Sequence, residues 1–363
     1  MWVQPFRSEQ LPPVKGAAED YKVAVLLNAN ARKVTSRVQR ALSHVVPEGD
    51  LFVSRSELDA HRIAQTVVDR RYHTVFLGGG DGTFTGFVNE ILNQVDLRRR
   101  HHPATQAPRF GVLKLGTGNS LAALVRSSST KGDGILDDVL RARAGEVPGY
   151  RSLDLLMVEG RRAPFAGLGM DGKLLNDYIW VKKNLGKGLL SPVMTGAGGY
   201  FASVAFKTVP HYLSKGTKVE GEIINGNSAP AYRLGPDGKP VGEPVAPGGV
   251  IFRGDLMMTA AATIPYYGFE LKMFPHAAKR RGMMHLRFGT LPPTAILANL
   301  PGLWAGTWFP EGLQDWHVKD VTLRFKEPMP FQISGDAEGY REEVHLSIAP
   351  EPVEVVDFTG AVN

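Results

Sequence analysis

The residues best suited to chemistry form a glycine-rich turn with a carboxylate inside it, Gly78-Gly-Gly-Asp-Gly-Thr83. The apolar run from His73 to Leu77 precedes this turn, and apolar residues at helical spacing follow it as far as Gln94. The pattern predicts a buried strand, a turn and a helix. Glycine lets the backbone approach a ligand closely, and the first amides of a helix bind anions. The stretch therefore predicts a phosphate-binding turn.

Asp81 makes this turn unusual, because a carboxylate repels phosphate unless a metal ion or a transferable proton lies between them. The residue favours phosphoryl chemistry over simple anion binding. A tight turn without any ligand is the alternative. The spacing does not fit the dinucleotide fingerprint G-x-G-x-x-G, and the chain contains no G-x-x-x-x-G-K-[ST].

The composition excludes other chemistries. The chain has no cysteine, so it has no disulfide, no thiolate metal site and no cysteine nucleophile. Its ten histidines include no H-E-x-x-H motif.

Alternating strands and helices surround the glycine turn and predict an α/β domain, a parallel sheet covered by helices. The predicted strands are Tyr21 to Leu27, Leu51 to Ser54, Thr74 to Leu77 and Phe110 to Leu115, and the predicted helices are Val34 to Val45, Leu58 to Arg70, Phe84 to Gln94 and Ser120 to Val125. Ligands of such sheets bind at the carboxyl ends of the strands, where the glycine turn lies.

From Arg151 onward, short strands at intervals of about 8 to 12 residues predict an antiparallel β-sandwich. Its strands are expected within Arg151 to Val158, Ala163 to Gly169, Val219 to Ile224, Val250 to Ala261, Met283 to Phe288, Val318 to Phe325, Phe331 to Ser334, Val344 to Ile348 and Val353 to Phe358. We therefore expect a tail over residues 1–20, an α/β domain over 21–150 and a sandwich domain over 151–363.

The distribution of charge and two uncharged segments indicate which partners the protein could bind. The net charge is +6, and the cations gather in short clusters such as 98–102, 161–162, 182–183 and 279–281. These clusters are either solvated loops or contacts to an anionic membrane surface. No aromatic-interleaved basic stripe favours nucleic acid. The uncharged runs 188–206 and 291–310 contain glycine and proline, which argues against helices that span a membrane. Each run is either a buried helix or an apolar cover for a lipid chain.

The first twenty residues lack the apolar core of a signal peptide, so the expected location is the cytoplasm with peripheral membrane association. A homodimer is left open.

Four motifs together carry a resemblance to a known family. Gly78 to Thr83, Leu115-Gly-Thr-Gly-Asn119, Phe165-Ala-Gly-Leu-Gly-Met-Asp171 and Asp336-Ala-Glu338 resemble the diacylglycerol kinase catalytic-domain family, which includes bacterial lipid kinases, sphingosine kinases and ceramide kinases. The order and spacing match from about Tyr21 to Phe358. The resemblance implies an ATP-dependent kinase that transfers the γ-phosphate to the hydroxyl of diacylglycerol or of a ceramide-like or sphingoid lipid.

The resemblance also implies roles for individual residues. Those placed against ATP are Asn28, Ser54, Gly79, Gly80, Asp81, Gly82, Thr83 and Thr117. The acidic pair would be Asp336 and Glu338, with Glu338 as the general base that takes the proton of the lipid hydroxyl. Asp81 would hold catalytic Mg²⁺ or share the proton transfer.

The sequence departs from the family in three places. Thr85 and Gly86 stand where the family has Asn-Glu, and Glu90 lies one helical turn further on the same face. Ala337 replaces a glycine in the acidic motif. Ser120 and the segment 275–282 replace acidic residues that hold a structural magnesium in bacterial members, so this second metal site is expected to be absent.

Two other functions remain open. An NAD kinase shares Gly-Gly-Asp-Gly but has no evident use for the uncharged runs. A catalytically weak lipid-binding protein would explain Thr85, Gly86 and Ala337, although Asp81, Asp336 and Glu338 are retained.

Overall fold

The computed structural model describes residues 22–116, 119–129, 134–169, 218–268 and 270–360, and these form two compact units. The first unit comprises the chain up to Leu153 together with the segment from Glu351, and the second comprises Asp154–Pro350. The expected tail over 1–20 and the uncharged run 188–206 lie outside the described residues.

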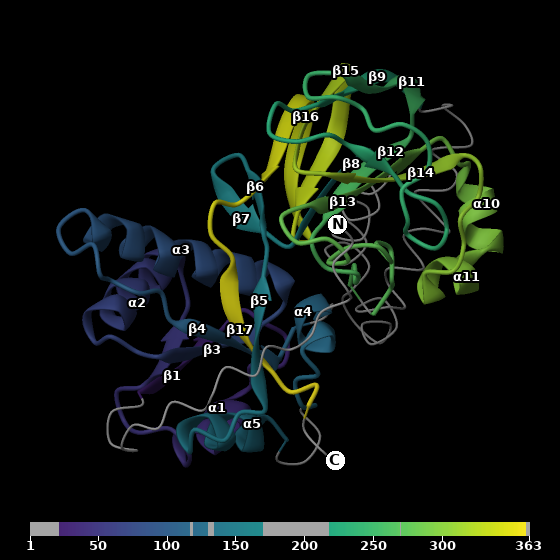
Figure 1. The fold of residues 1–363 in the computed structure, drawn as a ribbon. Helices are drawn as coiled ribbons and strands as arrows, with labels where there is room; N and C mark the ends of the chain where they lie inside the picture. Colours follow the sequence, from purple (N-terminus) through teal and green to yellow (C-terminus); the bar gives the residue numbers. More distant parts are fainter. Residues whose placement is uncertain (1–21, 117–118, 130–133, 170–217, 269, 361–363) are drawn as a thin grey trace. The chain divides into compact units, whose positions relative to one another are not determined.

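The first unit is a six-stranded sheet with helices on both faces (Figure 1). Its strands are β1 (Val23–Asn28), β2 (Leu51–Ser54), β3 (Thr74–Gly79), β4 (Arg109–Lys114), β5 (Gly149–Leu153) and β17 (Val353–Asp357), in the order β2-β1-β3-β4-β17-β5. Its helices are α1 (Ser36–Ser43), α2 (Glu57–Asp69), α3 (Asp81–Arg99), α4 (Ser120–Leu124) and α5 (Gly134–Arg143). In Figure 1, α2 and α3 cover one face, whereas α1 and α5 cover the other. The predicted α/β class is confirmed.

Burial and capping explain why these segments form these elements. The apolar β1 and β3 are almost fully buried, as expected for parallel strands covered on both faces. Two helices begin at hydroxyl caps: Thr35 accepts a hydrogen bond from the amide of Val38, and Ser56 accepts one from the amide of Asp59. Such a cap stabilises a helix by about 1 kcal/mol.

The last strand is not where the sequence analysis placed it. The segment Val353 to Phe358 was assigned to the second domain, but β17 lies in the first sheet, parallel to β4 and antiparallel to β5. An ion pair of 2.8 Å between Arg151 and Asp357 joins β5 to β17. An alternating apolar pattern predicts a strand but does not say which sheet the strand joins.

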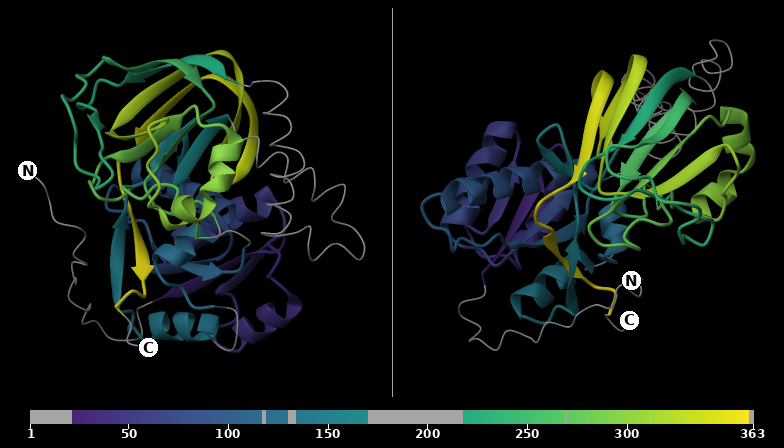
Figure 2. Two further views of the ribbon diagram at one scale, coloured as in Figure 1. Left: turned by 90° about the vertical axis from the view of Figure 1, so that its right-hand side faces the viewer. Right: turned by 45° about the horizontal axis from the view of Figure 1, so that its top comes forward.

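The second unit is built on antiparallel strands, which confirms the predicted class of the second domain. The strands are β6 (Leu156–Val158), β7 (Arg161–Ala163), β8 (Phe165–Gly169), β9 (Val219–Asn225), β10 (Tyr232–Arg233), β11 (Val250–Leu256), β12 (Met258–Ala262), β13 (Met284–Gly289), β14 (Leu313–Val318), β15 (Asp320–Ile333) and β16 (Asp336–Ile348). The long β15 pairs with β16 along one edge and with both β8 and β9 along the other (Figure 2).

Two short helices, α10 (Pro293–Ala298) and α11 (Leu300–Ala305), form much of the uncharged run 291–310. Among the described residues, no helix has both the length and the apolar character needed to span a membrane.

A buried polar network joins β13 to β14 in the second unit. Asp315 accepts hydrogen bonds from Arg287 Nε at 2.6 Å and Nη2 at 3.1 Å, and its Oδ1 lies 2.7 Å from His285 Nε2. Burial alone would raise the pKa of Asp315, but hydrogen bonding and charge from His285 and Arg287 outweigh it and hold that pKa well below its usual value. Removing one partner of such a buried pair typically costs about 3 to 5 kcal/mol.

Two buried histidines beside this network predict acid sensitivity. Burial lowers the pKa of His276 to about 3 and that of His317 to about 4, below the value of about 6.5 expected in the unfolded chain. The folded state therefore binds fewer protons. Stability should be full above about pH 6.5 and should fall towards pH 4 by up to about 1.4 kcal/mol per histidine per pH unit. Urea titrations followed by tryptophan fluorescence at several pH values measure this loss.

The control for this prediction is His44, which is exposed on the first unit. Replacing both His276 and His317 with glutamine should flatten the pH dependence, whereas His44→Gln should leave it unchanged. An equal slope in the double variant and in the parent chain would contradict the prediction.

Candidate active site

Three predicted nucleotide contacts lie side by side at one edge of the first sheet. Asn28, Ser54 and Gly79 are the last residues of β1, β2 and β3. Asn28 and Ser54 are direct register partners across the β1–β2 pair. Because these strands run parallel, their carboxyl ends meet at the same edge, where ligands of such sheets bind.

A side-chain hydrogen bond joins this edge to the glycine turn. Asn28 Nδ2 donates to Thr83 Oγ1 at 3.0 Å, while Asn28 Oδ1 accepts the amide of Asn30 at 2.9 Å. Thr83 in turn packs against Gly79, where an added Cβ would lie only 2.3 Å from the threonine hydroxyl. Gly79 is thus required by close packing, and Asn28 fixes the orientation of the first turn of α3.

Helix α3 begins in the glycine turn with no side-chain cap. Gly80 is its N-cap residue, and the helix runs from Asp81 for 19 residues. The first amides of a helix have no intrahelical partner and carry partial positive charge. At the start of α3 no side chain satisfies them. The amides that follow Gly80 are therefore suited to phosphate oxygens.

Gly116, which follows β4, lies directly against the glycine turn. A Cβ at Gly116 would lie 2.2 Å from the Cα of Gly80, so only glycine fits there. Asn119, with φ 52°, binds Gly116: its Oδ1 accepts the amide of Gly116 at 2.9 Å and its Nδ2 donates to the Gly116 carbonyl at 2.8 Å. Thr117, a predicted ATP contact, lies outside the described residues.

Asp81 binds the backbone of a neighbouring helix. Its side chain is buried, its Oδ2 accepts the amide of Ser120 at 2.9 Å, and its Oδ1 accepts the amide of Leu121 at 3.1 Å. Burial raises the pKa of Asp81, although these hydrogen bonds act in the opposite direction. The carboxylate thus holds the N-terminus of α4 against the start of α3.

This arrangement differs from the metal-binding role that the resemblance implied for Asp81. Both carboxylate oxygens face backbone amides. Over the described ranges of the chain, no group of three or more histidine, aspartate and glutamate side chains is arranged to hold a metal ion. The described residues therefore do not fit a magnesium site built by the protein, and a need for magnesium stays a prediction.

Two further residues make contacts that the sequence did not predict. The hydroxyl of Ser54 donates to the carbonyl of Ser56 at 2.9 Å, which shapes the turn before α2. Glu90, considered as a substitute for the missing family glutamate, lies 3.0 Å from His61 Nδ1 on α2.

At Gly86 an added Cβ would meet no atom within 4 Å, so packing does not require glycine there.

The acidic pair lies at the start of β16 in the second unit. Ser334 and Gly335, with φ of 52° and 87°, form the two-residue connection from β15 to β16, and Ile333 pairs with Asp336 across it. Left-handed conformations at both positions are typical of a tight hairpin turn. The acidic pair thus belongs to a strand of a regular hairpin, whereas its sequence taken alone resembles a solvated turn.

A β-bulge sets the direction of Glu338. Pro330 pairs with Tyr340 and Gln332 with Ala337, so two residues of β16, Glu338 and Gly339, oppose one residue of β15. Gly339 has φ 81°. Bulges of this kind redirect side chains and occur often beside active sites.

The charges around the acidic pair include one partner that the sequence analysis missed. Glu338 Oε2 lies 2.8 Å from Arg161 Nη2, on β7. The pKa of Asp336 is raised, because reduced hydration and the charge of Glu338 both disfavour ionisation, while Arg161 acts in the opposite direction. The Arg161-Arg162 cluster was the only sequence signal for this contact.

The position of Asp81 predicts a structural effect of its removal. Asp81→Ala would leave the amides of Ser120 and Leu121 without their acceptor, which costs about 1 to 3 kcal/mol for each buried group left unpaired. We expect urea denaturation followed by circular dichroism to show a loss of this size. The matched control is Asp137→Ala on α5, an exposed position where the change should stay within about 0.5 kcal/mol. Equal stabilities of the two variants would contradict this role of Asp81.

Comparison with known proteins agrees with the fold. Three solved structures of proteins from Bacillus anthracis str. Sterne, one described as a diacylglycerol kinase and two as putative diacylglycerol kinases, share 14% identity with the chain and cover 94% of it. The alignments cover 98% to 99% of those chains, with TM-scores of 0.56, 0.61 and 0.58, and at this identity they show a shared fold. None of the curated proteins compared matches the sequence.

A family model identifies the region that contains the glycine turn. Residues 22–149 match the model described as the diacylglycerol kinase catalytic domain. The matched region contains the parallel strands β1 to β4 and the glycine turn. The resemblance predicted from the sequence is confirmed over residues 22–149, which match the diacylglycerol kinase catalytic domain.

Proposed function

We propose that this protein is an ATP-dependent kinase that phosphorylates a hydroxyl group of a membrane lipid. The observation that carries the proposal is the uncapped N-terminus of α3 at the carboxyl edge of the sheet, within the region that matches a kinase family. The lipid is diacylglycerol or a ceramide-like or sphingoid lipid.

In this proposal the nucleotide phosphates bind to the first amides of α3. Gly80 allows close approach, and the hydrogen bond between Asn28 and Thr83 holds this first turn in place. Asp81 holds the N-terminus of α4 against the start of α3 through the amides of Ser120 and Leu121. Phosphoryl transfer depends mainly on positioning and charge neutralisation, and such a rigid cradle supplies the positioning.

Glu338 is the proposed general base. It stands at the family's acidic position, and the bulge at Glu338 and Gly339 gives its side chain a direction distinct from that of the regular strand. A carboxylate that accepts the hydroxyl proton makes the lipid oxygen a better nucleophile. Because the nucleotide cradle and the base lie in different units, the proposal requires both units for the reaction.

Two tryptophans support a lipid substrate: Trp304 lies in α11, and Trp308 follows this helix. Trp304 and Trp308 are partly exposed, and the exposed Lys272 donates its amide to the carbonyl of Trp304 at 3.1 Å. Tryptophan and lysine together suit the membrane interface, where an apolar ring and a cation can both be accommodated. We propose that this surface docks on anionic membranes and that the protein is a peripheral cytoplasmic enzyme.

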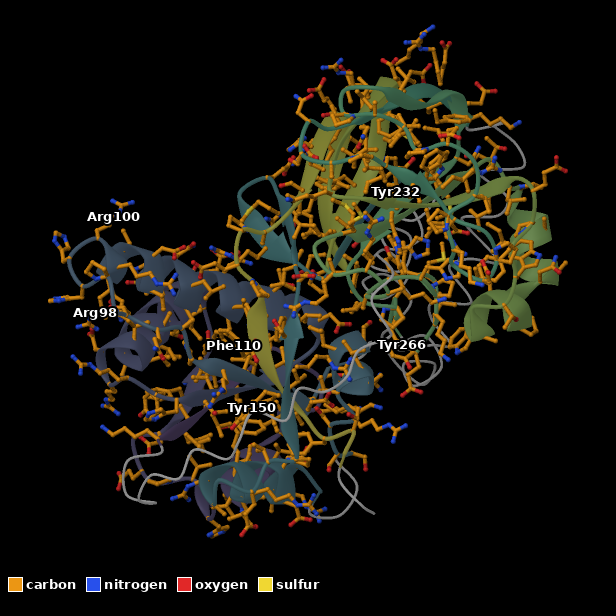
Figure 3. The ribbon with its side chains drawn as sticks, viewed as in Figure 1. Arg98, Arg100, Phe110, Tyr150, Tyr232 and Tyr266 are labelled. Atoms are coloured by element: carbon orange, nitrogen blue, oxygen red, sulfur yellow. The ribbon has the colours of Figure 1, made fainter. Side chains whose placement is uncertain are left out.

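The arginine cluster 98–102 supports membrane contact less strongly. Arg98 lies 2.6 Å from Asp69, and Arg99 lies 3.0 Å from Glu351 and 3.5 Å from Asp96. Arg98 and Arg100 lie at the C-terminal end of α3 (Figure 3). Pairing of Arg98 and Arg99 with acids reduces the charge that they offer to a membrane.

The direct test is a transfer assay with γ-labelled ATP. We expect label in a lipid fraction of total lipid extract and none in NAD(H) supplied in parallel. Label in NADP(H) would support the NAD kinase alternative. Lipid binding without label in either acceptor would support the catalytically weak lipid-binding protein.

A substitution separates binding from chemistry. Glu338→Gln keeps the shape of the side chain but removes the base, so transfer to lipid should fall at least ~100-fold while ATP affinity stays within about twofold. Calorimetric titration with ATP and the labelled-lipid assay measure the two effects. If nucleotide affinity collapsed together with activity, Glu338 would have a structural role.

The membrane contact predicts a salt and a tryptophan dependence. Binding to vesicles that contain anionic lipid should weaken as the salt concentration rises. Salt screens the attraction between protein cations and lipid head groups, over a length of about 8 Å at physiological ionic strength. Trp304→Ala or Trp308→Ala should reduce lipid phosphorylation more than ATP binding. The control is Val241→Ser, an exposed apolar position in the second unit. Salt-independent binding and full activity of both tryptophan variants would overturn the proposal.

A further inference from the structure

We propose that Arg161 is a positioning residue that orients the carboxylate of Glu338 for proton transfer; this inference rests on the proposed function. The observation behind it is the ion pair of 2.8 Å between Arg161 Nη2 and Glu338 Oε2. Within the part of the chain that the structure describes, the other oxygen, Oε1, makes no hydrogen bond, so it stays available to accept a proton.

The strand pairing explains why Glu338 needs such a partner. β16 pairs with β6 over Leu346–Ile348, and on that side of its first part no strand of the described residues is hydrogen-bonded. Glu338 also lies on a bulge, followed by Gly339 in the left-handed region. A glutamate side chain on such a segment has several open rotamers, and an ion pair to a neighbouring strand selects one of them.

A second ion pair, between Arg341 and Glu159, attaches the start of β16 to the β6–β7 hairpin. Arg341 Nε and Nη2 bind both carboxylate oxygens of Glu159 in the β6–β7 turn, and Arg341 Nη1 donates to the backbone carbonyl of Glu338 at 2.9 Å. This bidentate pair joins the start of β16 to the β6–β7 hairpin. The single contact of Arg161 therefore acts on the Glu338 side chain, while Arg341 holds the backbone.

The charged groups around Glu338 come from three places. Asp336 precedes it on the same strand, Arg161 lies on β7, and the Arg341–Glu159 pair flanks it. Asp336 carries the same charge as Glu338 when ionised. Arg161 is the cation that contacts the Glu338 side chain, and this contact fixes the direction of the carboxylate.

The test compares four variants of the full chain with labelled ATP and vesicles of total lipid extract. Arg161→Met should lower kcat at pH 7 about 10- to 100-fold and leave KM for ATP within about twofold, because the carboxylate of Glu338 loses the contact that orients it. Arg161→Lys, which keeps the cation, should restore most of kcat.

The matched control is Arg324→Met. Arg324 Nε lies 2.7 Å from Glu343 Oε2 in another Arg–Glu pair that includes a glutamate of β16, with both side chains more than half exposed. This variant should behave like the parent chain. The fourth variant, Glu338→Gln, should lose transfer.

The outcomes distinguish this inference from the proposed function. If Glu338→Gln is inactive while Arg161→Met matches Arg324→Met, the positioning role is wrong and the base assignment stands. A loss of kcat in Arg161→Met with a lowered melting temperature and no recovery of kcat in Arg161→Lys would make Arg161 structural and would also overturn the inference. Full activity of Glu338→Gln would overturn both assignments.

Discussion

The candidate nucleotide site depends on the contact between the Asp81 carboxylate and the first amides of α4. A buried charge is costly unless hydrogen bonds compensate for it, and here two backbone amides, those of Ser120 and Leu121, provide them. The contact joins the start of one helix to the start of the next, close to where Gly116 packs against Gly80. With this contact in place, the first amides of α3, which no side chain of the described residues caps, lie at the carboxyl edge of the sheet in a fixed arrangement.

This contact changes the interpretation of the glycine motif. From the sequence, a carboxylate within a phosphate-binding turn indicated a metal ligand or a proton acceptor. In the structure the same carboxylate satisfies amides of its own protein, so the motif combines two tasks. In the proposed function the glycines admit the nucleotide phosphates, while Asp81 holds α4 against the start of α3. The proposed proton acceptor is Glu338, in the second unit. Its side chain is partly exposed and forms an ion pair with Arg161.

Much of the fold was predictable from the sequence, because parallel strands buried on both faces have long apolar runs and their helices show apolar residues at helical spacing. The carboxyl edge with Asn28, Ser54 and Gly79 followed from the alternation of strands and helices. The sheet that β17 joins was not predictable, since sheet membership depends on contacts between distant segments. No strand was predicted over residues 313–317, which form most of β14. The predicted strands Val318 to Phe325 and Phe331 to Ser334 are one strand, β15, with register shifts where it pairs with β16.

The site details were less predictable for a related reason. Hydrogen bonds between residues far apart in the sequence, such as that from Asn28 to Thr83, leave no periodic pattern. Arg161 and Glu338 are likewise brought together only by the folding of the hairpins, so the sequence showed a basic pair and an acidic pair without their connection.

The most direct measurement of the central claim is nuclear magnetic resonance of the backbone amides at the start of α3 during titration with ATP and, separately, with adenosine. If the phosphates bind at the uncapped N-terminus, the amide signals of Asp81, Gly82 and Thr83 should shift strongly with ATP and little with adenosine. Amide signals that stay unchanged with ATP at saturating concentration, or that respond equally to adenosine, would contradict the account.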